Sequence, residues 1–149
     1  MRGSASIVIE ASPEAIYAIV SDVTRLGELS PECHRCEWNE GSSEAVVGAT
    51  FTGHNRLGTY EWATQCEVIA ADPGRVFAFE VFSPQTRYSR WTYELELDGA
   101  GTRVTETFEV LKLASVLKDA SPEQLAQRQA MLEDGMRQTL TRLKKIAET

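Results

Sequence analysis

Two groups of residues in this chain are of types that carry out chemistry. The first is the tetrapeptide Cys33-His34-Arg35-Cys36, in which two residues separate a pair of thiols. The second is a set of polar residues that fall on the apolar side of strand-like segments. These residues are Asn55, Thr64, Ser89, Tyr93 and Glu106.

The cysteine motif matches neither a zinc site nor a thioredoxin-like redox site. A structural zinc ion needs four ligands, and no second Cys/His pair follows at finger spacing; His54 and Cys66 are only distant candidates. A redox motif would begin a helix in a βαβ unit, which is missing here. We therefore interpret Cys33 and Cys36 as incidental thiols in a loop that enters a strand, and we expect neither a metal nor a cofactor.

Length and composition indicate one globular domain over residues 1–149, with 42% apolar residues and a quarter charged. A net charge of −7 repels phosphate backbones, so nucleic acid is not an expected partner. Neither a membrane-spanning run nor a signal pattern is present, so we expect a cytoplasmic protein without stable membrane insertion. The three cysteines argue against a disulfide framework. A monomer and a homodimer both stay open.

Among the elements that must position the polar residues, the one with the strongest sequence pattern is a long amphipathic helix over Ser121 to Glu148. Ser121, Pro122 and Gln124 form a capping signal at its start. Gly135 costs about 1 kcal/mol relative to Ala in a helix interior, so we expect a close approach or tight packing there. The apolar stripe of this helix consists of Leu125, Leu132, Met136, Leu140, Leu143 and Ala147.

The start of the chain combines a strand with two short helices. Ala5 to Glu10 alternates as a strand does, and Ser12-Pro13 then repeats the cap signal before an apolar helix face. A second short helix is expected from Asp22 through Leu29, ending near Ser30-Pro31.

From residue 35 to residue 110 the apolar period changes to two, which predicts a run of strands. Short turns between them favour antiparallel neighbours, so we expect an α+β domain whose curved antiparallel sheet wraps around the C-terminal helix. The predicted strands are Arg35–Asn39, Val47–Asn55, Tyr60–Ala70, Val76–Phe82, Tyr88–Leu97 and Arg103–Val110.

Alternation along each strand assigns side chains to the face that meets the helix. Trp91, Tyr93, Leu95 and Leu97 share one side of their strand, and Glu106 shares a side with its apolar neighbours. The predicted binding set on this inward face, with Met136 from the helix, is Phe51, Asn55, Trp62, Thr64, Phe77, Phe79, Trp91, Tyr93, Glu106 and Met136. The five Trp and Phe rings of this set are typical of a pocket for a flat apolar molecule, although each ring alone also fits a core position.

The chain resembles the polyketide cyclase/dehydrase group of the START-like (SRPBCC, Bet v 1-like) superfamily. The resemblance covers nearly the whole chain and rests on the segments IVIEASPEAIYAIVSDVTRLGELSPECHRCEWNEG, VGATFTGHNR, WATQCEVIAADPGRVFAFEV and GTRVTETFEV before a long final helix. It implies a helix-grip fold with a hydrophobic cavity between sheet and helix. Members bind lipids, quinones, polyketides or other apolar molecules, and some are aromatase/cyclases.

Glu106 and Tyr93 are the candidate catalytic residues. A carboxyl on an apolar face is costly to ionise, so its pKa should rise, and it could then orient a ligand hydroxyl or move a proton. The alternative is a structural role, in which Glu106 pairs with a nearby Arg, Asn or Tyr. Asn55 and Tyr93 could likewise bond to each other, to Glu106 or to water.

Three functions stay open at this point. The first is binding of a lipid-, quinone- or polyketide-like molecule, and the second is an aromatase/cyclase or dehydratase that uses Glu106 or Tyr93. Family aromatases are associated with a cavity arginine, whereas Arg90 and Arg103 point outward here. The third is a protein-partner module. The apolar segment Leu111 to Asp119 is either a flap over the cavity or a short turn of core helix.

Overall fold

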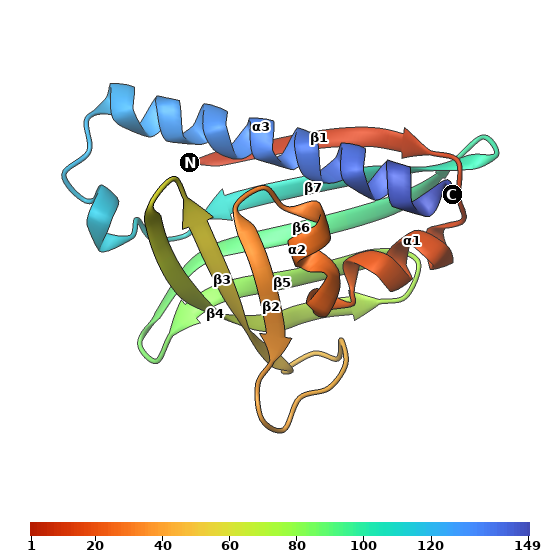
Figure 1. Ribbon diagram of the computed structural model, residues 1–149, viewed down its shortest axis with the longest axis horizontal. Coiled ribbons are helices and arrows are strands. Elements are labelled where there is room, and N and C mark those ends of the chain that lie inside the picture. The colour runs from red at the N-terminus through yellow and green to blue at the C-terminus, as the bar shows by residue number, and fades with distance from the viewer.

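The computed structural model describes residues 1–149 and contains one seven-stranded antiparallel sheet with the strand order β1-β7-β6-β5-β4-β3-β2 (Figure 1). Consecutive strands from β2 to β7 are neighbours, as expected for a meander, and the N-terminal strand pairs with β7. The predicted α+β helix-grip fold is confirmed. The strands are β1 (Arg2–Ile9), β2 (Cys33–Trp38), β3 (Thr50–Leu57), β4 (Tyr60–Asp72), β5 (Val76–Ser83), β6 (Thr86–Asp98) and β7 (Gly101–Val110).

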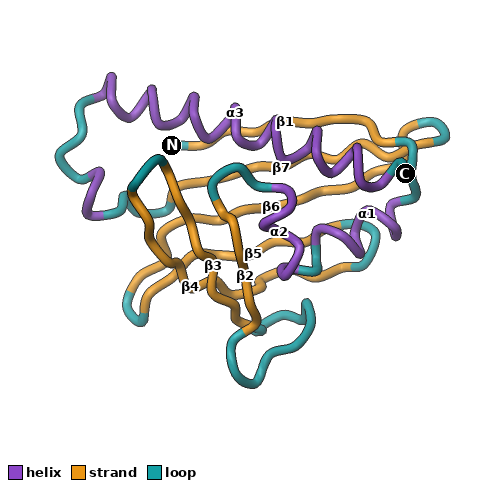
Figure 2. Tube along the Cα trace, viewed as in Figure 1, coloured by secondary structure: helices purple, strands orange, loops and turns teal.

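The helices begin where the capping signals predict. Ser12 accepts a hydrogen bond from the Ala15 amide, and Ser121 forms a complete capping box with Gln124. The helical segments are α1 (Pro13–Val20), the 3₁₀ turn η1 (Val23–Arg25), α2 (Leu26–Leu29), the 3₁₀ turn η2 (Ser115–Leu117) and α3 (Pro122–Ala147), which Figure 2 separates from strands and loops. None of them combines the length and the apolar character that a membrane span needs.

Several strand ends were predicted wrongly by two or three residues, among them the starts of β1, β2 and β3, which were expected at Ala5, Arg35 and Val47. The segment from Val47 was expected to open a strand, but β3 begins at Thr50 and Val47 is 67% exposed in the preceding loop. Gly48 has a φ of 95°, which is the left-handed region and cannot continue an extended strand. The glycine therefore ends the loop, and the strand starts only after it.

The long helix connects the two edges of the curled sheet. α3 packs along β1 at one edge. Toward the other edge, Arg128 donates two hydrogen bonds to the Glu32 carboxylate at 2.7 and 2.9 Å, and Arg142 donates to the Leu29 carbonyl at 3.1 Å. Glu32 and Leu29 lie just before β2, so α3 closes the open side of the sheet.

The hydrophobic core is concentrated under the second half of α3. Met136, Leu140 and Leu143 are nearly or fully buried there, whereas no residue of α3 before Met136 is buried. The main apolar cluster joins α1, α2 and the sheet to this second half through residues such as Ile16 and Val104. The first half of α3 therefore lies over the sheet without a packed apolar contact layer of its own.

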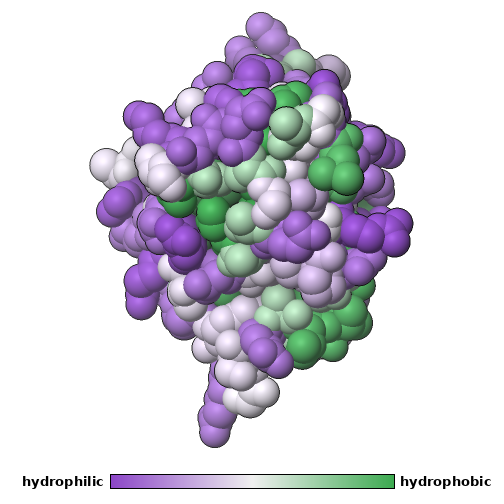
Figure 3. All heavy atoms as spheres, turned by 90° about the vertical axis from the view of Figure 1, so that its right-hand side faces the viewer, coloured by the Kyte–Doolittle hydropathy of each residue, from purple (hydrophilic) through white to green (hydrophobic).

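Two expectations about packing do not hold. A Cβ atom added at Gly135 would lie 3.5 Å from Pro31 Cγ, which is ordinary contact, so the glycine is not required by a close approach. Leu97 is 76% exposed rather than packed under the helix, because it lies at the far end of β6, next to the turn into β7. Figure 3 shows the end of the molecule that carries the C-terminus, where hydrophobic residues appear as separate patches among hydrophilic ones.

Candidate functional site

The strand register brings the predicted residues together on the concave face. Trp91 is the cross-strand partner of Phe79 on β5 and of Phe108 on β7. Tyr93, two positions further along β6, lies between Phe77 and Glu106 in the same way. Trp91 and Phe108 also stack with ring centroids 5.5 Å apart, and the aromatic side chains of three neighbouring strands share the concave face.

Glu106 is the most unusual group on this surface. It is 4% exposed, and its Oε1 atom is buried with no hydrogen-bond partner. Burial in this apolar setting raises the pKa of Glu106 to about 8, and the Tyr93 phenol offsets the rise only in part. At neutral pH the carboxyl is therefore mostly protonated and can donate a hydrogen bond.

The Tyr93 phenol is also held in its neutral form. Burial raises its pKa well above 10, and the neighbouring Glu106 carboxyl adds to the rise. Glu106 and Tyr93 thus form a cross-strand pair of neutral proton donors beneath the aromatic surface. Such a pair suits recognition of a carbonyl or hydroxyl oxygen, and Glu106 is the member whose proton is exchangeable near neutral pH.

Asn55 and Thr64 form a second polar group, on β3 and β4. Asn55 Nδ2 lies 3.4 Å from Thr64 Oγ1 and 3.5 Å from the Gly53 carbonyl oxygen, which are long for hydrogen bonds. Of the partners considered for Asn55, the structure supplies neither Tyr93 nor Glu106. Both side chains are half-buried, so they retain hydrogen-bonding capacity toward the concave side.

The predicted aromatic residues divide into core and surface members. Phe51 packs edge-on against Phe79 at 5.2 Å, and Phe77 packs edge-on against Tyr17 at 6.4 Å. Phe51 and Phe77 belong to the main core, which matches the structural role considered for them. The buried members of the predicted set are Phe51, Phe77, Tyr93, Glu106 and Met136, and the half-buried ones are Asn55, Trp62, Thr64, Phe79 and Trp91.

The arginines of the sheet lie on its convex side, as expected. Arg90 forms ion pairs with Glu80 at 2.7 Å and with Glu109 at 3.8 Å, and Arg103 pairs with Asp98 at 2.9 Å. The partners of Arg90 are its cross-strand neighbours on the outward face. Neither arginine is therefore available to the Glu106 and Tyr93 pair.

The cysteines are the residues whose placement was missed. Cys33 and Cys36 were interpreted as incidental thiols, but their sulfur atoms lie 3.2 Å apart. Both face Gly53, where an added Cβ would be 3.6 Å from each sulfur, and the third thiol, Cys66, lies 3.8 Å from Thr64 Oγ1. The signal that would have found the pair is a β-bulge, which alternation of apolar residues does not reveal.

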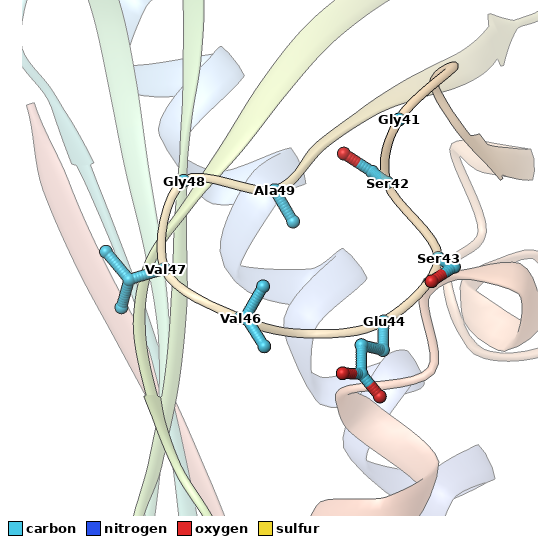
Figure 4. Close-up of a pocket in the computed structure, with 8 residues that line it drawn as sticks. All are labelled: Gly41, Ser42, Ser43, Glu44, Val46, Val47, Gly48 and Ala49. Atoms are coloured by element: carbon cyan, nitrogen blue, oxygen red, sulfur yellow. The ribbon is translucent and has the colours of Figure 1, made fainter.

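Two hollows on the surface lie away from the predicted residues. One, of about 390 Å³, is enclosed by the loop after β2 and is lined by Gly41, Ser42, Ser43, Glu44, Val46, Val47, Gly48 and Ala49 (Figure 4). The other lies against polar residues on the exposed side of α3. Neither contains a member of the predicted binding set.

Residues 2–148 match the family described as polyketide cyclase / dehydrase and lipid transport. The chain belongs to this family. A member from Corynebacterium glutamicum, the Polyketide_cyc-like protein Cgl2372, is 35% identical with a TM-score of 0.67, over 97% of this chain and 90% of that one. No curated protein matches the chain.

Two solved structures with lower sequence identity share the fold of this chain. The di-domain ARO/CYC StfQ from the steffimycin biosynthetic pathway is 13% identical with a TM-score of 0.75, over 99% of this chain and 50% of that one. Major latex-like protein 151 from Panax ginseng is 13% identical with a TM-score of 0.71, over 100% of this chain and 98% of that one. At this identity the likeness concerns the fold alone.

Proposed function

We propose that the protein binds a hydrophobic small molecule between the concave face of the sheet and α3. The observation that carries the proposal is the buried Glu106 carboxyl, whose Oε1 atom has no partner, on the same concave face as the half-buried rings of Trp91 and Phe79. A buried polar atom without a partner costs about 1–3 kcal/mol, and a ligand oxygen at this position would recover that cost. The family includes lipid transport, which agrees with this function.

The ligand enters under the first half of α3 in this proposal. That half of the helix contributes no buried residue, and Met131 on it is 46% exposed. Further exposed apolar residues are found at Leu57 and Tyr60, which flank the β3–β4 turn, and at Val116 in η2. In Figure 1 the β3–β4 turn, η2 and the start of α3 all lie toward the left end of the molecule. The segment after β7 is exposed rather than a turn of core helix, which favours its role as a flap.

The chemistry of the face defines the ligand class. Aromatic rings favour a flat or elongated apolar molecule, and the neutral donors Glu106 and Tyr93 favour an oxygen acceptor within it. A lipid, a quinone or a polyketide has this combination. A ligand with a carboxylate near Glu106 would be disfavoured, since the site offers no positive charge there.

A second candidate function is aromatase/cyclase or dehydratase activity on a polyketide. It is favoured by the Glu106 pKa of about 8, which places a buried carboxyl where it can both donate and accept a proton near neutral pH. The outward Arg90 and Arg103 leave this mechanism without the arginine associated with family aromatases. We therefore place ligand binding first.

Native mass spectrometry of the purified protein, followed by titration with a naphthoquinone and a long-chain fatty alcohol, tests the binding function. Trp91→Leu should weaken naphthoquinone binding about fivefold, because ring stacking contributes roughly 1 kcal/mol beyond area burial. Thr92→Ala, a change at the next position on the opposite face of β6, is the matched control and should bind as the wild type does. Equal affinity of both variants would contradict this site.

Glu106→Gln distinguishes the two functions. An amide still donates a hydrogen bond, so binding of the quinone should persist, whereas proton transfer to a polyketide mimic should cease. Unchanged turnover by Glu106→Gln would exclude the catalytic role of this carboxyl. Absence of any turnover by the wild type, with binding intact, would leave the binding function as the better description.

A further inference from the structure

The Cys33 and Cys36 side chains lie on the same side of β2 because of a β-bulge. Residues separated by three positions point to opposite faces of a regular strand. Here the register shifts between Cys33, which pairs with Asn55, and Arg35, which pairs with His54, so His34 is an extra residue. Cys36 then pairs with Gly53, and both sulfurs point to the concave side.

The bulge also places the Cα atoms of Cys33 and Cys36 at a separation that a disulfide can span. Because Cys33 and Cys36 are opposite Asn55 and Gly53, their Cα atoms are separated by about the length of two strand residues, or roughly 6.8 Å. Disulfides span Cα separations of roughly 4.4–6.8 Å. The sulfur atoms, 3.2 Å apart, need only a small side-chain rotation to bond.

Gly53 lies directly against both sulfurs on the neighbouring strand. A Cβ atom at this position would lie 3.6 Å from both Cys33 Sγ and Cys36 Sγ and 3.0 Å from Thr64 Oγ1. Cys36 is buried with 5% exposure, whereas Cys33 is only half-buried at the start of the strand. An external reagent would therefore reach Cys33 first.

We propose that Cys33 and Cys36 form a redox-active dithiol that small-molecule disulfides of the glutathione class oxidise to an internal disulfide. The Cys33 thiolate attacks one sulfur of the small disulfide, forms a mixed disulfide and releases one small thiolate. Cys36 then loses its proton and attacks Cys33 Sγ, which forms the internal bond and releases the second small thiolate. The two thiol protons pass to the two released thiolates, so the protein is oxidised by two electrons and the reagent is reduced by two.

The ionisation of the pair supports this order of events. The hydrogen bond from Cys36 lowers the pKa of Cys33, and burial opposes it only in part. The same interaction, followed by burial, raises the pKa of Cys36, and burial raises the pKa of Cys66 to about 12. The half-buried Cys33 is thus the thiol that ionises first and attacks, and Cys66 stays protonated.

The test uses glutathione disulfide with the folded full-length protein, followed by alkylation in denaturant and mass spectrometry with peptide mapping. The wild type should lose two hydrogen atoms, retain one alkylatable thiol at Cys66 and recover all three after dithiothreitol. Cys36→Ser should stop at a glutathione adduct on Cys33, because no resolving thiol is present. Cys33→Ser should form no internal disulfide.

Cys66→Ser is the matched control and should form the internal disulfide as the wild type does. The proposal is overturned if the wild type keeps three reduced thiols, or if it accumulates a stable glutathione adduct on Cys33 with Cys36 free. Mapping of a disulfide that contains Cys66 would overturn it as well. These outcomes are read from the wild-type protein, so they do not depend on the folding of any variant.

Discussion

Replacing Glu106 by Gln should change how stability depends on pH. The carboxyl has a pKa of about 8 in the folded protein against 4.5 for an ordinary Glu, so the folded state keeps a proton that the unfolded chain has lost between these two values. The free energy of unfolding of the wild type therefore falls as the pH rises from 4.5 to 8, and this contribution is constant above and below that window. Gln cannot ionise and removes the dependence.

The magnitude follows from the two pKa values. Each pKa unit corresponds to about 1.4 kcal/mol, so the buried carboxyl lowers wild-type stability at pH 9 by at most about 5 kcal/mol relative to pH 4. Glu106→Gln should be close to the wild type at pH 4 and more stable than it at pH 9. Because the amide retains the size of the carboxyl, packing around Tyr93 and Phe108 changes little.

Urea denaturation at several pH values between 4 and 9, followed by tryptophan fluorescence, measures this difference. Glu94→Gln is the control, since the same change is made at an exposed position on the opposite face of β6. Parallel curves for the wild type and Glu106→Gln would refute the reasoning, because they would mean that the carboxyl is not held neutral in the fold.

Two further predictions concern backbone and side-chain contacts. Gly27→Ala should lower the urea midpoint strongly, at a cost of about 1–3 kcal/mol or more, because its Cβ would lie 2.3 Å from the His34 carbonyl oxygen. Gly135→Ala, whose Cβ meets only Pro31 at 3.5 Å, should instead stabilise by about 0.5–1 kcal/mol, and a loss of stability would contradict that packing. Arg128→Met should cost about 1 kcal/mol of stability, because Arg128 pairs with Glu32 in a partly buried bidentate contact. Arg137→Met is the control and should cost little, because Arg137 forms an exposed pair. Equal urea midpoints for the two variants would contradict a stabilising role of the Arg128–Glu32 pair between α3 and the segment before β2.

Alternation of residue types was sufficient to predict the faces of the sheet. The rule that successive strand residues point to opposite sides placed Tyr93, Glu106 and Phe108 inward, and all three are buried. The capping signals likewise located the starts of α1 and α3. Local steric and hydrogen-bonding preferences determine these features, so a single sequence contains them.

The features that were not predicted from the sequence depend on contacts between distant segments. The bulge at His34 forms because β2 must match β3, so the sulfur pair could not be predicted from the spacing of Cys33 and Cys36 alone. The exposure of Leu97 depends on where β6 ends relative to the core. The apolar stripe of α3 predicted burial along its whole length, yet burial begins only at Met136, because the core lies under the second half. These outcomes require the tertiary arrangement.

The unequal anchoring of α3 implies unequal local stability along one helix. Amides near Leu140 and Leu143 should exchange with solvent deuterium only when the whole domain unfolds, since these side chains belong to the main core. Amides near Leu125 should exchange through small local openings, which the Arg128–Glu32 pair opposes. The first turns of α3 can then separate from the sheet while the domain stays folded. A bulky ligand could pass beneath these turns without global unfolding.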